Sequence, residues 1–177
     1  MREREDVVVA VIAAAPEGRL ASRIRLQKSV YLLDRLGFES GFEFDYHHYG
    51  PYSRELDNAT ADAKALKLID ERIEHSVRDG AGYSVFEAKS TPDRELLAAA
   101  DRPRLRERIA LFARTNVTVL ELAATVDWLW RVEKVSDWQS EVAARKGAKT
   151  GGGRLERAVE LLVALGLGPP TPATARS

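Results

Sequence analysis

The chain contains no cysteine among its 177 residues, and only one methionine and three histidines. Without cysteine it can form no disulfide, no thiolate nucleophile and no cysteine-based zinc site. It also has no excess of charge, because 27 Lys and Arg residues are balanced by 27 Asp and Glu residues. A dedicated nucleic-acid-binding protein usually carries a basic excess, so the balance argues against that class, although a local basic patch would suffice.

Long apolar runs are missing as well. The run over residues 7–15 is too short to cross a bilayer. It ends in three alanines, like a signal peptide before its cleavage site, but acidic residues outnumber basic ones in front of it, whereas a signal peptide begins with positive charge. We therefore expect a buried helix here, a cytoplasmic protein and no membrane partner.

Helix-start and helix-stop signals dominate the first half of the chain. Ser22 and Ser53 are placed to cap helices, and Gly37 to end one. The expected elements are helices over residues 3–15, 23–36 and 54–68, followed by a hairpin over residues 68–86 around a glycine-rich turn. Three helices and a hairpin follow the order of a winged-helix domain, so we assign residues 1–90 to a winged-helix-like domain.

A short strand is expected between the second and third helices. Residues 38–49 alternate loosely, which would place Phe42, Phe44 and Tyr46 on one side of it. Pro51 should break this strand.

The second half is expected to be a helical extension over residues 91–167, followed by a disordered tail over residues 168–177. The expected helices cover residues 92–100, 103–114, 118–130, 137–145 and 154–165, with a flexible Lys- and Gly-rich loop over residues 146–153. Residues 119–130 are apolar on more than one side, so the last helix or a second chain should cover them. The predicted fold class is mainly α with a small β-hairpin.

The most unusual feature is a corner where aromatic and imidazole rings crowd the Gly50–Pro51 turn. Glycine allows a tight backbone approach and proline fixes φ, so the corner should be rigid. We expect a tyrosine ring of the corner to pack against the second helix. A structural hinge and a docking site for a partner both remain open. The candidate partner-binding residues are Arg25, Lys28, Tyr31, His48, Tyr49, Tyr52 and Arg54.

Charge patterns give two further expectations. The third helix has as many carboxylates as cations, which disfavours an approach to phosphates. On the second helix Arg25 and Lys28 share one face, for which a solvated surface is the preferred interpretation and an acidic partner the alternative. The best candidate for contact with nucleic acid or an acidic partner is a basic patch of Arg145, Lys146, Lys149 and Arg154.

No catalytic or metal-binding pattern is found. His47 and His48 would point to opposite faces of a strand, and no third ligand has a recognisable spacing. Ser53 lacks the flanking glycines of a nucleophile elbow. The glycines after Lys149 do not form a phosphate-binding loop, because the lysine precedes them. We therefore expect no enzyme, no metal and no cofactor.

Two tryptophans in the apolar segment carry a separate expectation. Trp128 and Trp130 lie two residues apart and point in different directions on a helix. One of them should therefore face another part of the chain or a second chain.

Two segments resemble a known family. Residues 25–33, Arg-Leu-Gln-Lys-Ser-Val-Tyr-Leu-Leu, and residues 46–56, Tyr-His-His-Tyr-Gly-Pro-Tyr-Ser-Arg-Glu-Leu, resemble the LQKLxYLL … YGPYSxEL signature of bacterial and archaeal YwgA-like proteins. They are more distantly similar to the Panacea domain of SocA-like antitoxins. The resemblance covers about the first third of the chain, and the longer helical second half departs from the Panacea pattern.

The Panacea resemblance implies action by binding a toxin or protease partner and not by catalysis. Our leading hypothesis is therefore a non-enzymatic protein-interaction or regulatory module of an antitoxin or defence type, whose partner is a toxin or a second copy of the chain. The alternative is a winged-helix transcriptional regulator that binds nucleic acid.

Overall fold

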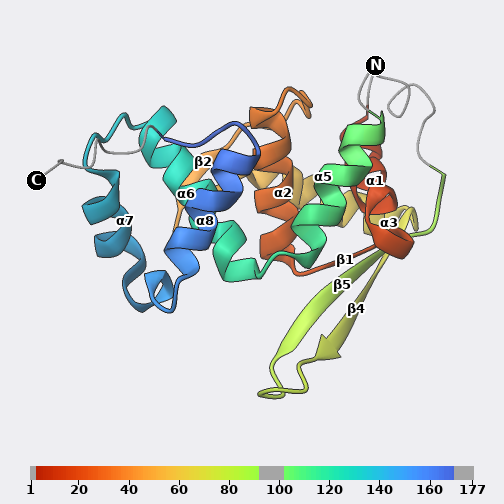
Figure 1. Ribbon diagram of the computed structural model, residues 1–177. Coiled ribbons are helices and arrows are strands. Elements are labelled where there is room, and N and C mark those ends of the chain that lie inside the picture. The colour runs from red at the N-terminus through yellow and green to blue at the C-terminus, as the bar shows by residue number, and fades with distance from the viewer. Residues whose placement is uncertain (1–2, 92–101, 170–177) are drawn as a thin grey trace, which may run out of the picture.

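The computed structural model describes residues 3–91 and 102–169, and these residues are mostly helical with a small antiparallel sheet, as the sequence predicts (Figure 1). The elements are α1 (Arg4–Ala14), η1 (Pro16–Gly18), β1 (Arg19–Ala21), α2 (Arg23–Arg35), β2 (Asp45–His47), β3 (Gly50–Tyr52), α3 (Arg54–Ala65), β4 (Ile69–His75), β5 (Gly82–Ala88), α5 (Arg102–Arg114), α6 (Val117–Arg131), α7 (Trp138–Lys146), η2 (Gly147–Thr150) and α8 (Arg154–Ala164). The helix predicted over residues 92–100 and the tail from residue 170 lie outside the described residues. Gly168, the first residue of the predicted tail, lies close to Val163 of α8.

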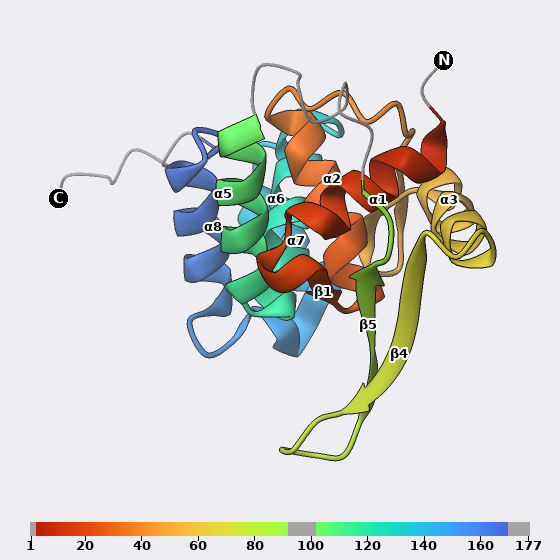
Figure 2. The same ribbon diagram turned by 90° about the vertical axis from the view of Figure 1, so that its right-hand side faces the viewer.

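The N-terminal elements combine helices with a three-stranded antiparallel sheet of order β1–β5–β4. The predicted hairpin is present as β4 and β5, and Figure 2 shows it projecting from the body as a long arm. β1 was not expected from the sequence. It is only three residues long and is recognisable through its pairing, in which the buried Leu20 lies opposite Phe86.

Glu71 of β4 ties the base of this arm to two helices. Arg23 of α2 donates to its carboxylate at 2.8 and 2.9 Å, Lys64 of α3 at 3.0 Å and Ser84 of β5 at 2.7 Å. The Glu71 side chain is only 6% exposed, and burial alone would raise its pKa. The hydrogen bonds from Ser84, Arg23 and Lys64 outweigh burial and lower the pKa of Glu71 to about 2.

We predict that Glu71→Gln destabilises the fold by about 1–3 kcal/mol near neutral pH, since it removes the charge from a set of hydrogen bonds. The stabilisation by ionised Glu71 is complete above its unfolded pKa of 4.5 and is lost as pH falls toward the folded value of about 2. Urea unfolding between these pH values should therefore lose part of its acid dependence in Glu71→Gln. The control is Glu74→Gln on the same strand, where the contacts to Arg72 and Tyr83 are both 3.4 Å long. Equal effects of the two substitutions would contradict the prediction.

In the second half, α6 is the central helix. It packs against α8, α7, α2 and β3, and most of its residues are buried. The expectation that residues 119–130 are covered is confirmed, and α8 of the same chain provides the largest part of the cover. One hydrophobic cluster includes side chains from Val7 in α1 to Leu167 after α8.

The α2–α6 contact carries a buried polar group. The Tyr31 hydroxyl donates to Asp127 at 2.7 Å, and Arg35 donates to the same carboxylate oxygen at 3.0 Å. The Tyr31 ring lies 6.2 Å from Trp128. Trp128 therefore faces the N-terminal half of the chain, as expected for one of the two tryptophans.

Within the described residues, no single helix is long and apolar enough to cross a membrane. α5 and α6 pass such a test only as a pair, and they are bent by 118° at the break between them.

The prediction of a strand broken by Pro51 is wrong. Pro51 lies in β3, which pairs antiparallel with β2 across a turn at His48 and Tyr49, so that Tyr46 lies opposite Pro51. Hydrogen-bonded and non-hydrogen-bonded pairs alternate along such a ladder, and proline is accommodated where no donor is needed. Phe42 and Phe44 precede β2 and are not in a strand.

Candidate functional site

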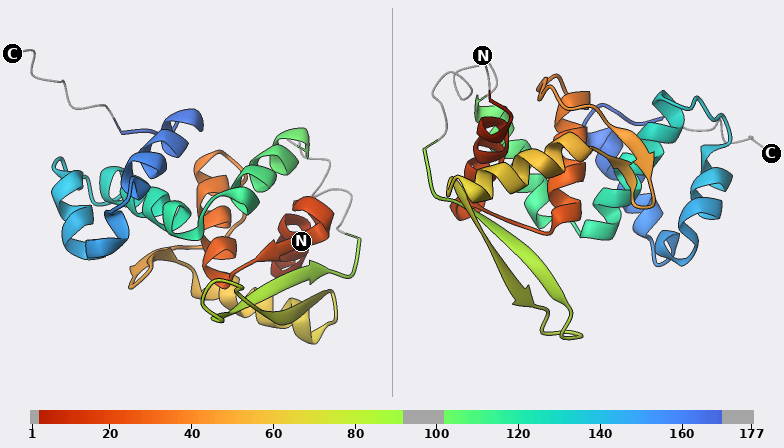
Figure 3. Two further views of the ribbon diagram at one scale, coloured as in Figure 1. Left: turned by 60° about the horizontal axis from the view of Figure 1, so that its bottom comes forward. Right: turned by 180° about the vertical axis from the view of Figure 1, so that it is seen from behind.

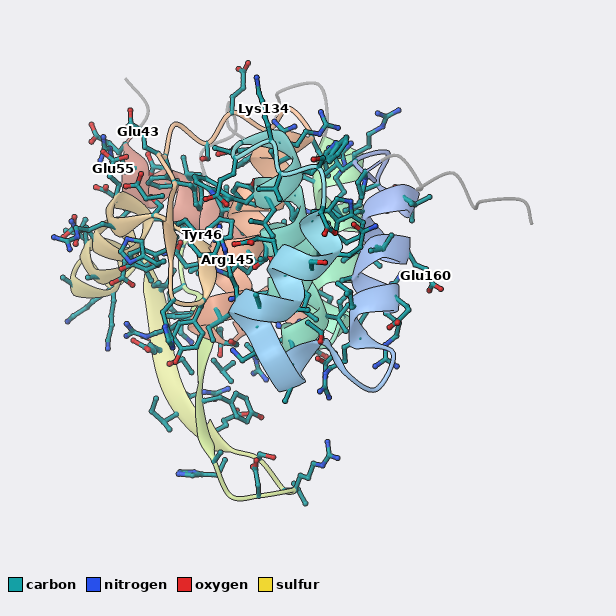
Figure 4. All side chains as sticks on the ribbon, turned by 90° about the vertical axis from the view of Figure 1, so that its left-hand side faces the viewer. Glu43, Tyr46, Glu55, Lys134, Arg145 and Glu160 are labelled. Carbon is teal, nitrogen blue, oxygen red and sulfur yellow. The ribbon has the colours of Figure 1, made fainter. Side chains whose placement is uncertain are left out.

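The structure joins the corner and the basic patch, which the sequence suggested as separate candidates. The Arg145 guanidinium lies 4.6 Å from the centre of the Tyr46 ring, and Lys149 Nζ lies 4.9 Å from that of Tyr49. Lys146 Nζ donates to the carbonyl of His48 at 3.2 Å. Figure 3 shows the β2–β3 hairpin beside α6 and α7, and Figure 4 shows Tyr46 and Arg145 together. We call residues 46–52 with Arg145, Lys146 and Lys149 the hairpin-tip site.

A group of charged side chains lies beneath this site. Glu121 of α6 accepts from Lys146 at 2.8 Å and from Lys149 at 3.0 and 3.2 Å. Lys28 of α2, which is 1% exposed, donates to the carbonyl of Pro51 at 2.5 Å. We call these four residues the buried lysine cluster. The interpretation of Lys28 as part of a solvated face is therefore wrong. The connection predicted over residues 146–153 is shorter than expected, because Lys146 ends α7 and η2 follows before a turn at residues 151–153.

The environment of Lys28 changes its proton affinity. Burial lowers its pKa most strongly, Glu121 opposes this, and Lys146 and Lys149 lower it further, with a result of about 7. Charged and neutral Lys28 are thus both populated near neutral pH.

This shift gives a pH-dependent stability. Between the folded pKa of about 7 and the unfolded value of 10.5, the unfolded chain holds a proton that the folded chain lacks. Stability should therefore rise with pH in this window, with a slope of up to about 1.4 kcal/mol per pH unit. Lys28→Met should flatten the slope of urea-unfolding free energy measured from about pH 7 to pH 9. Lys134→Met, at an exposed lysine that points away from the body in Figure 4, should keep it. A slope unchanged in Lys28→Met would refute the assignment.

The backbone of the corner is held from both sides. On the α2 side, the Gln27 side chain exchanges two hydrogen bonds of 2.9 Å with the backbone of Ser53, whose hydroxyl caps α3 as predicted. On the α6 side, Gly50 approaches Thr125 so closely that an added Cβ would lie 2.6 Å from its hydroxyl oxygen. The corner is therefore fixed through its main chain.

Two glycines allow this close approach to be tested separately from backbone strain. Gly50 and Gly37 have nearly the same φ, 88° and 90°, but a Cβ on Gly37 would meet nothing within 4 Å. Both alanine variants carry the strain of positive φ, and only Gly50→Ala also clashes with Thr125. We predict that Gly50→Ala loses about 1–3 kcal/mol more stability than Gly37→Ala in urea unfolding. Equal losses would show that the corner can move away from α6.

The rings of Tyr49 and Tyr52 have different neighbours. Tyr49 is 49% exposed and its ring contacts are with His48, at 5.3 Å, and Lys149. The Tyr52 ring lies tilted against that of His47, with the ring centres 4.8 Å apart, and burial followed by the Asp57 carboxylate raises the pKa of its hydroxyl. The backbone of the corner meets α2 at Gln27 and Lys28.

The remaining predicted residues divide into structural and surface groups. Arg25 is half-buried and donates to backbone carbonyls, at 2.9 Å to Ala21 and 2.6 Å to Phe112, and burial lowers its pKa. Tyr31 is buried, and its hydroxyl donates to Asp127. Arg154 donates to the carbonyl of Lys149 at 2.7 Å and so braces η2. Arg54 is exposed at the start of α3.

The basic patch is therefore less cationic than its sequence suggested. Arg145 pairs with Glu133 at 2.8 Å and with Glu141 at 2.7 Å. Lys146 is buried against Glu121, whereas the Lys149 side chain is 41% exposed beside the tip.

Sequence reasoning missed Gln27, Glu121 and Thr125. Glu121 had a visible signal, because it is a carboxylate inside an otherwise apolar helical run. A charge in such a place requires a partner, but the partner's position along the chain could not be read from the pattern.

Within residues 3–91 and 102–169, no three His, Asp or Glu side chains gather in a way that could hold a metal ion. The chain matches no family model, and a search of curated proteins finds no significant match. The similarity to YwgA-like proteins thus remains a prediction from its two motif segments.

Proposed function

We propose that this chain is a non-enzymatic, cytoplasmic protein-interaction module that docks a protein partner at the hairpin-tip site. The observation that carries the proposal is the half-exposed Tyr49 ring, which projects from a braced hairpin beside Lys149. Aromatic side chains dominate binding hot spots when they are presented in a defined position. A site that is already rigid loses little conformational entropy on binding, which favours affinity.

The element order supports a winged-helix-like N-terminal domain. α1, β1, α2, α3 and the β4–β5 arm follow one another as helices and strands do in that architecture, with the arm as the wing. The domain would present the hairpin tip between α2 and α3, and the helices after it would support the tip from the opposite side.

Charge argues for protein over nucleic acid as the partner. The arm carries Asp70, Glu71, Glu74, Asp79 and Glu87 against fewer cations. Two cations near it, Arg23 and Lys64, are already paired with Glu71. An element that enters a DNA groove needs an excess of positive charge, so the nucleic-acid-binding regulator is the weaker candidate.

The identity of the partner is proposed from the resemblance in the motif segments. A toxin or protease neutralised by binding fits the Panacea-like motif, and a second copy of the chain would use the same exposed tip. Both assign the chain to regulation or defence.

A crosslinking experiment tests the docking site. A photoreactive amino acid at the exposed His48 should yield a discrete adduct in source-cell extract, identified by mass spectrometry, and Tyr49→Ala should lower its yield at least about fivefold at unchanged melting temperature. The control position is Val77, which is fully exposed at the end of the arm. Equal adducts from His48 and Val77, or submicromolar salt-sensitive binding to random duplex DNA, would refute the proposal and favour the regulator.

A further inference from the structure

The buried lysine cluster has an imbalance of charge. Lys28, Lys146 and Lys149 share the single carboxylate of Glu121, and no other described carboxylate lies within ion-pair distance of them. Lys28 has the carbonyl of Pro51 as its hydrogen-bond acceptor. Buried cations without an equal number of anions are expensive, because desolvation opposes the charged state. The cluster therefore favours the arrival of a further negative charge.

We propose that the partner presents an acidic segment, and that one of its carboxylates pairs with Lys149 at the hairpin tip. This inference rests on the proposed docking function and names the chemistry of the partner. Lys149 is the member of the cluster that reaches solvent, and its amine lies against the exposed Tyr49 ring. An aspartate or glutamate next to an apolar side chain would contact the lysine and the ring together.

Glu121 transmits this contact to the interior. In the free chain Lys149 donates hydrogen bonds to both carboxylate oxygens of Glu121, while Lys146 donates to one of them. A carboxylate that pairs with Lys149 lets Glu121 compensate Lys146 and Lys28 more fully. The charged groups that face Lys28 are Glu121, Lys146 and Lys149, so an added anion raises its proton affinity. Binding should therefore take up a proton near neutral pH.

A nucleic acid fits this site less well. Its phosphates require several free cations along a track. At the tip, Arg145 is occupied by Glu133 and Glu141, and Arg154 by backbone carbonyls. One accessible amine beside one aromatic ring suits a single carboxylate of a peptide.

The probe is a short fluorescein-labelled peptide of glutamate and leucine, titrated into the full chain by fluorescence anisotropy and mapped by amide chemical shifts. Its glutamine counterpart and a single-stranded oligonucleotide serve as comparisons. The glutamate peptide should shift the amides of His48 to Gly50 and of Lys149, and the glutamine peptide should not. Lys149→Ala should weaken binding about fivefold. Arg106→Ala, at an exposed arginine of α5 that has no ion pair among the described residues, should change it less than about twofold.

The pH dependence separates this mechanism from simple surface attraction. Affinity for the glutamate peptide should fall from about pH 6 to pH 9 in the wild type, and Lys28→Met should remove most of that fall, because the proton taken up resides on Lys28. If the affinity of Lys28→Met for the glutamate peptide falls with pH as much as that of the wild type, the coupling of Lys149 to Lys28 through Glu121 is refuted.

Equal binding of the two peptides, or no loss in Lys149→Ala, would overturn the acidic-partner inference. Tighter binding of the oligonucleotide at the same amides would reassign the site to nucleic acid. If the His48 adduct persists undiminished in Lys149→Ala, the docking function stands and only the acidic chemistry fails. If the peptide binds at the tip while His48 forms no adduct, the anionic site stands and the docking function fails.

Discussion

The rest of the structure around the hairpin tip depends on one ion pair, that of Glu121 with Lys146 at 2.8 Å inside the protein. Both side chains are almost fully buried, so neither charge can be solvated without its partner. The pair joins α6 to the end of α7, and Lys146 then reaches the carbonyl of His48. A helix, a second helix and a hairpin far away in sequence are thereby held at one point. Removing one member would leave an uncompensated charge in the core, which costs about 3–5 kcal/mol in comparable cases.

The corner is the place where the N-terminal and C-terminal halves of the chain are joined. The corner lies between α2 and α6, with Gln27 and Lys28 bonding its backbone on one side and Thr125 packing on Gly50 on the other. A hinge and a docking site had been the competing interpretations of the corner. The geometry makes them compatible, because a main chain fixed from beneath leaves the rings of His48 and Tyr49 in a defined exposed position.

Helix caps and β-prone runs could be predicted from the sequence, because they depend on interactions between neighbouring residues. Ser22 and Ser53 cap their helices as expected, and the β-prone runs form the predicted arm. Pro51 misled the strand prediction, because its place in a ladder depends on which partner strand lies opposite. The candidate site could not be predicted from such local signals. A lysine on a polar helix face is expected to be solvated. Only the packing of α6 and β3 against α2 makes Lys28 interior, and no spacing within the second helix contains that information.

A net charge of zero also conceals how the charges are used. α3 and the arm carry more carboxylates than cations, and Arg23 and Lys64 are already paired with Glu71, so the elements that would read DNA offer no excess of positive charge. Arg104, Arg106 and Arg114 of α5 are exposed and have no ion pair among the described residues, whereas Arg145 and Lys146, which looked like a basic patch, are paired with carboxylates. Ion pairs within the chain, which a count of charges along the sequence does not show, therefore reduce the positive charge of that patch. What makes the tip attractive to an anion is the shortage of carboxylates beneath it, where a low local dielectric strengthens each uncompensated charge.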